Sequence, residues 1–210
     1  MLDNTKPLIL LAAGESKRMG KPKQLLPYRD SSLIRHAVTE GLKSNCHPVV
    51  VVLGANCDRI TSELAAFPIE TTYNSSWQQG MSSSIAEGIN WLLNAEINFE
   101  AVVIALADQP LVTSENYNSL VKRYRSHSVK AVASEYSNTL GVPALFSRDL
   151  VPQLLNMHQQ GGAKKLLIKY SDRSLNLTLP QAALDIDTPE DYQKLLQLLN
   201  KTTHYHSRFN

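Results

Sequence analysis

Three continuous apolar runs alternate with helix-like segments in the first half of this chain, and this alternation limits the folds open to it. The runs cover residues 8–12, 49–53 and 101–106. Strands buried on both faces have this composition, which is typical of parallel sheets covered by helices. Between the first two runs, an apolar stripe from Leu33 to Leu42 predicts an amphipathic helix. This spacing predicts an α/β fold of three layers with a mostly parallel central sheet.

The remaining segments continue the same order with less regularity. We predict helices at residues 82–93, 114–124, 150–155 and 164–170, and strands at residues 129–133, 142–146 and 175–179. Thr188 and Asp191 flank Pro189 as a reciprocal cap would, so a last helix is expected to begin there. We find no repeat or linker, and we expect a single domain over residues 1–201 and a frayed tail over 202–210, with His204 and His206.

Composition and charge exclude several classes of protein. Hydrophobic residues make up 43% of the chain and charged residues 19%, which is ordinary for a globular protein. A net charge of +2 gives no electrostatic case for binding nucleic acid. The chain has no apolar run long enough to span a membrane, and its first residues do not resemble a signal peptide. Cys46 and Cys57 have neither zinc-site nor redox spacing, so we expect two structural thiols in a cytoplasmic protein.

The first informative segment follows the first predicted strand. Only nine of the 210 residues are glycine, fewer than the usual share of about 7%, so their positions are informative. Gly14 ends the apolar run, and the polar loop after it carries Ser16, Arg18 and Lys23. Small residues let backbone amides approach an anion, and the basic side chains supply the opposite charge. The loop therefore predicts a phosphate site at the carboxyl end of a strand, although its spacing is not that of a Walker loop.

A second segment places hydroxyl groups at the start of a helix. Gly80 is followed by three serines, of which Ser82 and Ser84 are the candidate ligand contacts. Backbone donors and short polar side chains there suit a polar ligand. Ordinary helix capping is the alternative, although a cap needs only one serine.

Two acidic segments complete the set. Asp108 comes directly after the strand predicted at residues 101–106, where Mg²⁺ is commonly held by one or two carboxylates together with substrate phosphates. Asp185 and Asp187 occupy alternate positions of a predicted short strand and would point to one side. A loop cap at Asp108, and favourable placement of the other two near a helix N-terminus, are the alternatives. No histidine stands where a general base would be expected. Nucleotidyl transfer onto a phosphate oxygen, which needs no base, fits best.

These segments resemble the MobA-like nucleotidyltransferases, and most closely their molybdenum cofactor cytidylyltransferase branch. The resemblance rests on five motifs in order: L-A-A-G-x-S-x-R-M-G-x-P-K-Q-L-L-P, N-x-x-W-x-x-G-M-S-S-S, A-D-Q-P, G-V-P-A-L-F and D-I-D-T-P-E-D-Y. It implies a Rossmann-like nucleotidyltransferase domain that joins CMP from CTP to the terminal phosphate of molybdopterin and releases pyrophosphate.

The resemblance also implies roles for individual residues. Arg18, Lys23 and Asp108 would be catalytic, with Asp108, Asp185 and Asp187 near Mg²⁺. The nucleotide would be bound by Ala12, Ala13, Gly14, Ser16, Arg18, Lys23, Gly80, Ser82 and Ser84. Ala13 favours CTP over GTP within the family, and we hypothesise that its methyl group selects the smaller base. Gln160 and Lys164 depart from the branch, which usually has Asp and Arg at those positions.

Two other functions remain open from the sequence. The first is a cytidylyl- or uridylyltransferase that acts on a sugar or polyol phosphate. The second is a non-catalytic accessory protein that binds the cofactor for a molybdenum hydroxylase. Under the favoured function, a molybdenum hydroxylase client or its chaperone would be the protein partner.

Overall fold

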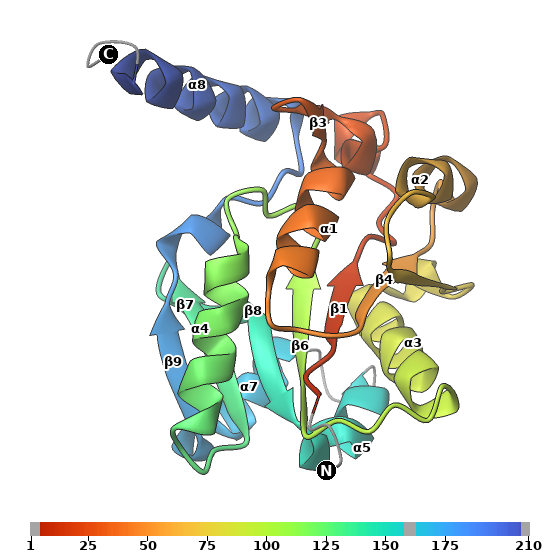
Figure 1. Cartoon of the computed structure of the whole chain (residues 1–210), viewed down its shortest axis with the longest axis vertical. Helices are drawn as coiled ribbons and strands as arrows, with labels where there is room; N and C mark the ends of the chain where they lie inside the picture. The colour runs from red at the N-terminus through yellow and green to blue at the C-terminus, as the bar shows by residue number, and fades with distance from the viewer. Residues whose placement is uncertain (1–4, 158–162, 207–210) are drawn as a thin grey trace.

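The computed structural model, which describes residues 5–157 and 163–206, has a seven-stranded sheet at its centre (Figure 1). The strands are β1 Leu8–Leu11, β4 Val49–Leu53, β5 Glu70–Tyr73, β6 Ala101–Leu106, β7 Ala131–Tyr136, β8 Thr139–Ser147 and β9 Ser174–Thr178. Their spatial order is β5-β4-β1-β6-β8-β7-β9, and only β8 runs antiparallel to its neighbours. The prediction of a mostly parallel sheet is therefore confirmed.

Helices cover both faces of this sheet. They are α1 Leu33–Lys43, α2 Cys57–Leu64, α3 Met81–Asn94, α4 Ser114–Arg125, α5 Val151–Leu155, α7 Ala163–Lys169 and α8 Pro189–His206. Helices α1, α2 and α4 pack on one face, and α3, α5 and α7 pack on the other. Figure 1 shows α1 and α4 in front of the sheet. The prediction of three layers is confirmed.

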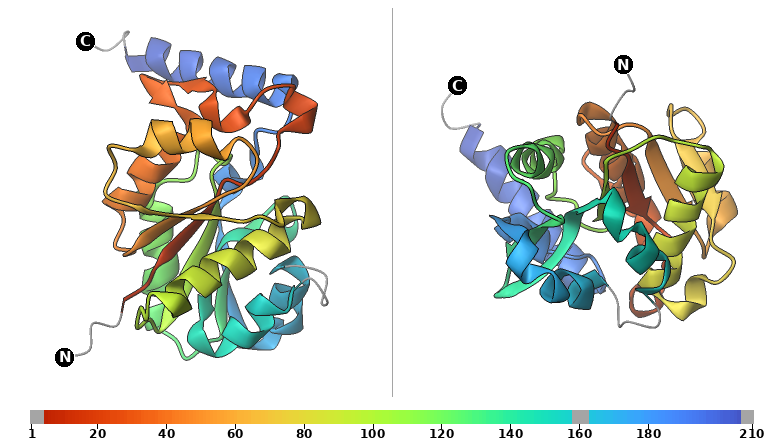
Figure 2. Two further views of the ribbon diagram at one scale, coloured as in Figure 1. Left: turned by 90° about the vertical axis from the view of Figure 1, so that its right-hand side faces the viewer. Right: turned by 90° about the horizontal axis from the view of Figure 1, so that it is seen from below.

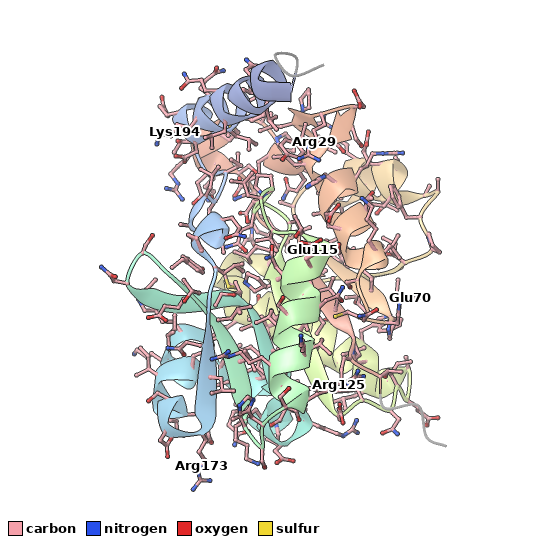
Figure 3. All side chains as sticks on the ribbon, turned by 60° about the vertical axis from the view of Figure 1, so that its left-hand side comes forward. Arg29, Glu70, Glu115, Arg125, Arg173 and Lys194 are labelled. Carbon is pink, nitrogen blue, oxygen red and sulfur yellow. The ribbon has the colours of Figure 1, made fainter. Side chains whose placement is uncertain are left out.

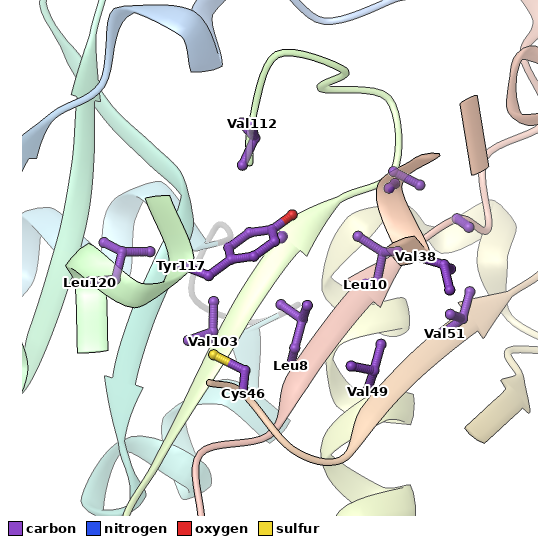
Figure 4. Close-up of a cluster of buried hydrophobic side chains, with 14 of the residues drawn as sticks. Leu8, Leu10, Val38, Cys46, Val49, Val51, Val103, Val112, Tyr117 and Leu120 are labelled. Atoms are coloured by element: carbon purple, nitrogen blue, oxygen red, sulfur yellow. The ribbon is translucent and has the colours of Figure 1, made fainter. Parts of the chain in front are cut away.

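Strand β1 shows why the apolar runs are continuous. Leu8 and Leu10 point into the cluster beneath α1 and α4, while Ile9 and Leu11 point into the cluster beneath α3. Because successive side chains of a strand alternate between faces, a strand covered on both sides needs apolar residues at every position. Figure 4 shows the first cluster, where Tyr117 of α4 lies near Cys46. Burial raises the pKa of the Cys46 thiol to about 11, consistent with a structural thiol.

A third cluster joins the last helix to the first loop. The short antiparallel pair β2 Pro27–Tyr28 and β3 Ser31–Ser32 lies under α8, and Tyr192 of α8 donates a hydrogen bond to the Pro27 carbonyl (2.6 Å). Figure 2 shows α8 against this segment, at the end of the molecule away from the N-terminus. The predicted cap is confirmed, since the Thr188 and Asp191 side chains each bond the other's backbone N–H. Helix α8 continues to His206, past the expected boundary at residue 201.

Three elements were missed and one was wrong. The sequence analysis did not predict α2, β5 or the β2–β3 pair. β5 is a mostly exposed edge strand, Glu70–Tyr73, so it has no apolar run to mark it. The short strand predicted around Asp185 and Asp187 is wrong. Residues 184–188 lie outside the strands, and one backbone hydrogen bond, from Ile186 N to Asp108 O (3.0 Å), holds them against the sheet.

The surface carries charge of both signs. The charged side chains labelled in Figure 3 are all exposed, and they come from five separate parts of the chain: Arg29, Glu70, Glu115, Arg125, Arg173 and Lys194. Among the described helices, none combines the length and the apolar character that crossing a membrane requires. Because β1, β4 and β6 are parallel, the loops that follow them meet at one edge of the sheet.

Candidate functional site

The loop after β1 has its carbonyl groups bonded and its N–H groups free. The Nε2 of Gln24 donates to Ala12 O (3.0 Å) and Gly14 O (2.9 Å), and the N–H of Ala55 donates to Ala13 O (3.1 Å). The N–H groups of Ala13, Gly14 and Glu15 donate to no group within residues 5–157 and 163–206. Successive free amides at the carboxyl end of a strand form a binding site for an anion.

Ser16 supports this loop from within. It has left-handed backbone geometry (φ 65°), and its Oγ accepts a hydrogen bond from Lys23 N (3.0 Å) and donates to Gln24 Oε1 (3.4 Å). Ser16 does not line the cavity described below. Its hydroxyl therefore holds the loop in shape.

Charged side chains from three distant segments meet beside the loop. Lys23 Nζ forms ion pairs with Asp108 and with Asp187, the second at 2.7 Å. Arg18 pairs with the other oxygen of Asp187 (2.7 Å). Burial lowers the pKa of Lys23, but the charges and hydrogen bonds of Asp108 and Asp187 outweigh this and raise it. Burial likewise acts to raise the pKa of Asp187, yet Lys23 and Arg18 hold it below its usual value.

Two of the three aspartates keep buried oxygens without a donor. Asp108 Oδ1 and Asp185 Oδ1 have no hydrogen-bond partner within the described chain. Burial, followed by the charge of Asp108, raises the pKa of Asp185 to about 6. Among the described residues, no group of three or more His, Cys, Asp or Glu side chains is arranged to hold a metal ion. A cation held by one or two carboxylates and substrate phosphates remains compatible with Asp108.

A cavity of about 190 Å³ opens between these groups and the start of α3. Its lining comprises Leu11, Ala12, Ala13, Gly14, Lys23, Gln24, Leu33, Trp77, Gly80, Met81, Ser84, Leu106, Ala107 and Asp108. Seven of these were predicted site residues: Ala12, Ala13, Gly14, Lys23, Gly80, Ser84 and Asp108. Arg18 and Asp187 join the site through Lys23, and Asp185 lies two residues from Asp187. Ser82 is half-buried but is not part of the lining.

The start of α3 is built around Asn74, which begins the second motif but was given no role from the sequence. Its Nδ2 donates to Ser83 Oγ (2.8 Å) and Ser84 Oγ (3.0 Å), and the side chain is 3% exposed. The N-cap of α3 is Gly80, without a side-chain capping bond, and the Ser83 hydroxyl is within donating distance of the Gly80 carbonyl (2.8 Å). Serine capping therefore does not account for this segment, and Ser84 lines the cavity.

The lack of a side chain at Gly54 allows the end of β4 to lie against the loop after β1. A β-carbon on Gly54 would lie 2.7 Å from Ala13 O and 2.7 Å from the Cβ of Trp77, closer than such atoms can approach. Gly14 differs, because a β-carbon there would meet nothing within 4 Å. No role was assigned from the sequence to Gln24 or to the apolar lining residues. Gln24, Trp77 and Met81 do stand in the motifs that carry the family resemblance, and this was the signal that could have selected them.

The model of the MobA-like NTP transferase domain matches residues 8–174 of this chain. The chain belongs to this family. Arg18, Lys23 and Asp108, which the motifs pointed to, therefore lie at the sheet edge where this family fold brings its strand ends together. Gln160 lies outside the described residues, and Lys164 is an exposed residue of α7.

Individual relatives carry different names. The chain is 28% identical to the nicotine blue oxidoreductase of Paenarthrobacter nicotinovorans, over 90% of this chain and 95% of that one. It is 22% identical to the molybdenum cofactor cytidylyltransferase of Escherichia coli K12, over 88% and 92%. The crystal structure of Rv0371c from Mycobacterium tuberculosis has a TM-score of 0.80 at 25% identity, over 94% and 100%. The same protein has been solved in complex with manganese (TM-score 0.74, 23% identity, over 92% and 98%).

Proposed function

We propose that this protein transfers CMP from CTP to the terminal phosphate of molybdopterin and releases pyrophosphate. The observation that carries the proposal is the row of free N–H groups at Ala13–Glu15, beside the Lys23–Asp108–Asp187 ion pairs and a cavity. Membership of a nucleotidyltransferase family supports the reaction type. The similarity to a molybdenum cofactor cytidylyltransferase supports the choice of acceptor.

Different residues at this edge of the sheet have different roles in the transfer. The free amides and the cations Lys23 and Arg18 bind the triphosphate. An oxygen of the acceptor phosphate forms a bond to the α-phosphorus, while the bond from that phosphorus to the bridging oxygen of the β-phosphate breaks. The electron pair leaves with pyrophosphate, whose charge Lys23 and Arg18 neutralise. The attacking oxygen is already ionised, so the reaction needs positioning and charge neutralisation and no general base.

Asp108 is the residue that fits a divalent cation. Its Oδ1 is buried and lacks a donor, and carboxylate oxygen is a preferred ligand of Mg²⁺. When bound, Mg²⁺ would supply positive charge to the phosphates. Lys23 pairs with the other Asp108 oxygen, so a cation would compete with Lys23 for the charge of this carboxyl group. Asp187 is positioned to keep Lys23 close by.

The preference for CTP is part of the proposal and is assigned to Ala13. A β-carbon on Gly54 would lie 2.8 Å from the Ala13 methyl, so that methyl packs towards the end of β4. The methyl group acts on the base indirectly, by fixing the path of the loop backbone that lines the cavity. Equal turnover of CTP and GTP would contradict this assignment.

The deciding experiment measures pyrophosphate release with Mg²⁺, molybdopterin and each of the four nucleoside triphosphates. We expect release with CTP that depends on both metal and molybdopterin. Activity only with sugar or polyol phosphates as acceptors would favour the alternative transferase. If Asp108→Ala left cofactor maturation unchanged, a non-catalytic carrier for a molybdenum hydroxylase would be favoured. Transfer of the product to such a hydroxylase, or to its chaperone, would be tested by co-purification.

A further inference from the structure

Gln24 uses its whole side-chain amide on the first loop. The residue is 3% exposed and lies in the short 3-10 helix Lys23–Leu25. Both hydrogens of Nε2 are used, one on Ala12 O and one on Gly14 O, and Oε1 accepts from the hydroxyl of Ser16. One buried side chain therefore bonds three of the five residues from Ala12 to Ser16.

These bonds determine where the backbone N–H groups point. In a trans peptide, the C=O and the N–H of the same peptide plane point in opposite directions. Since Ala12 O and Gly14 O both turn towards Gln24, the N–H groups of Ala13 and Glu15 must turn away from it. Ala13 O is held separately by Ala55 N (3.1 Å), and the lack of a side chain at Gly54 allows that approach.

We propose that Gln24 is a positioning residue for nucleotide binding, which keeps the loop amides directed outward at the phosphates. This inference rests on the proposed nucleotidyl transfer. Gln24 acts through the backbone of the loop, so its loss affects how the nucleotide is bound more than how fast the bond is broken. Ser16 has a smaller part in the same role, since it orients Oε1 of Gln24 and holds Lys23 N.

The test replaces Gln24 by glutamate, which has the same shape but no hydrogen to donate. We expect Gln24→Glu to raise the Kd for CTP, measured by calorimetry without an acceptor, about tenfold, which corresponds to the loss of two hydrogen bonds. KM for CTP should rise by a similar factor, while kcat stays within about twofold. In wild type, nucleotide should shift the amide resonances of Ala13, Gly14 and Glu15, and Gln24→Glu should weaken those shifts.

Ser134 provides a matched control. It is fully buried in β7, donates to the Pro143 carbonyl and does not line the cavity. Ser134→Ala should lower Tm and leave the Kd for CTP unchanged. If Gln24→Glu fails to fold, Ser16→Ala serves as the milder variant, with an expected twofold to threefold rise in Kd. Unchanged Kd and amide shifts in a folded Gln24 or Ser16 variant would overturn the inference. If wild-type protein bound no nucleoside triphosphate, the proposed function would fail first.

Discussion

The first loop and the acidic residues lie at the same sheet edge, but their polar groups are in opposite states. The loop amides of Ala13–Glu15 are free, whereas Asp108 and Asp187 already share Lys23 as a counter-charge. An anion can therefore bind the loop without displacing a protein contact. A cation at Asp108 competes with Lys23 for the same carboxyl group. An anion that binds at the loop adds contacts and breaks none, whereas a cation that binds at the acidic residues replaces their contact with Lys23.

This difference also explains why Lys23 is central. It lines the cavity beside the loop and forms ion pairs with both aspartates. Nucleotide phosphates offer Lys23 a second set of anionic partners. In the proposed reaction, Lys23 would turn to these phosphates and so release Asp108 for a metal ion. We therefore expect nucleotide and divalent cation to bind more tightly together than separately.

The largest effect is expected from Asp108→Asn. This variant keeps the shape of the side chain and removes its charge. Lys23 then loses one of its two counter-charges, and a cation loses its carboxylate ligand. We expect pyrophosphate release to fall by about 10²–10³-fold, the usual effect of losing one transition-state contact. Asp149→Asn, in an exposed ion pair with Lys130, is the control and should stay near wild type. A loss smaller than about tenfold at Asp108 would contradict its assigned role.

Lys23→Met should weaken the binding of nucleotide at the loop and strengthen the binding of a cation at the aspartates. Nucleotide affinity should fall by about 10- to 100-fold, because a buried cation that contacts phosphate is lost. Affinity for Mn²⁺ in the absence of nucleotide should rise, since Asp108 and Asp187 lose their internal counter-charge. Calorimetry with each ligand alone measures both effects, and Lys43→Met on the exposed end of α1 is the control. Weaker or unchanged Mn²⁺ binding would show that no exchange takes place.

Gly14→Ala should weaken ligand binding without lowering the stability of the fold. A methyl group there enters open space beside the free amides, so we expect about tenfold weaker CTP binding with an unchanged Tm. Gly54→Ala should lower both Tm and affinity, because its methyl would overlap the Ala13 carbonyl at 2.7 Å. Thermal denaturation and calorimetry on both variants separate the two cases. A large loss of Tm in Gly14→Ala would contradict an open approach at this residue.

The smallest effect concerns Asp185 and pH. Burial raises the pKa of Asp185 to about 6, so the folded state favours the neutral acid and loses stability as pH rises from about 4 through 6. Asp185→Asn removes this penalty. After allowance for solvent screening it is about 1 kcal/mol, or an increase in Tm of about 2–4 °C at pH 8 without metal. The gain should vanish near pH 4. An equal gain at both pH values would mean that titration of Asp185 is not its source.

The sequence was sufficient for the elements that carry an unbroken apolar run. β4 and β6 begin and end where the runs at residues 49–53 and 101–106 do, because strands covered on both faces admit only apolar residues. β5 could not be found in this way, since its residues Glu70–Tyr73 are mostly exposed at the sheet edge. The acidic segment at 185–187 was wrongly predicted as a strand. Its alternation arises because Ile186 is buried and one bond ties it to Asp108.

The sequence by itself determined the layered fold, the family motifs and most of the charged residues of the site, because these depend on local pattern and residue chemistry. Only the tertiary structure decided how those charges are used. Lys23, Asp108 and Asp187 are up to 164 residues apart, and no spacing indicates that one lysine neutralises two aspartates. Likewise, nothing in the sequence indicates that the Gln24 side chain bonds the first loop, because those hydrogen bonds form only in the folded chain. Hydrogen-bond partners depend on orientation in space, which the order of residues along the chain does not contain.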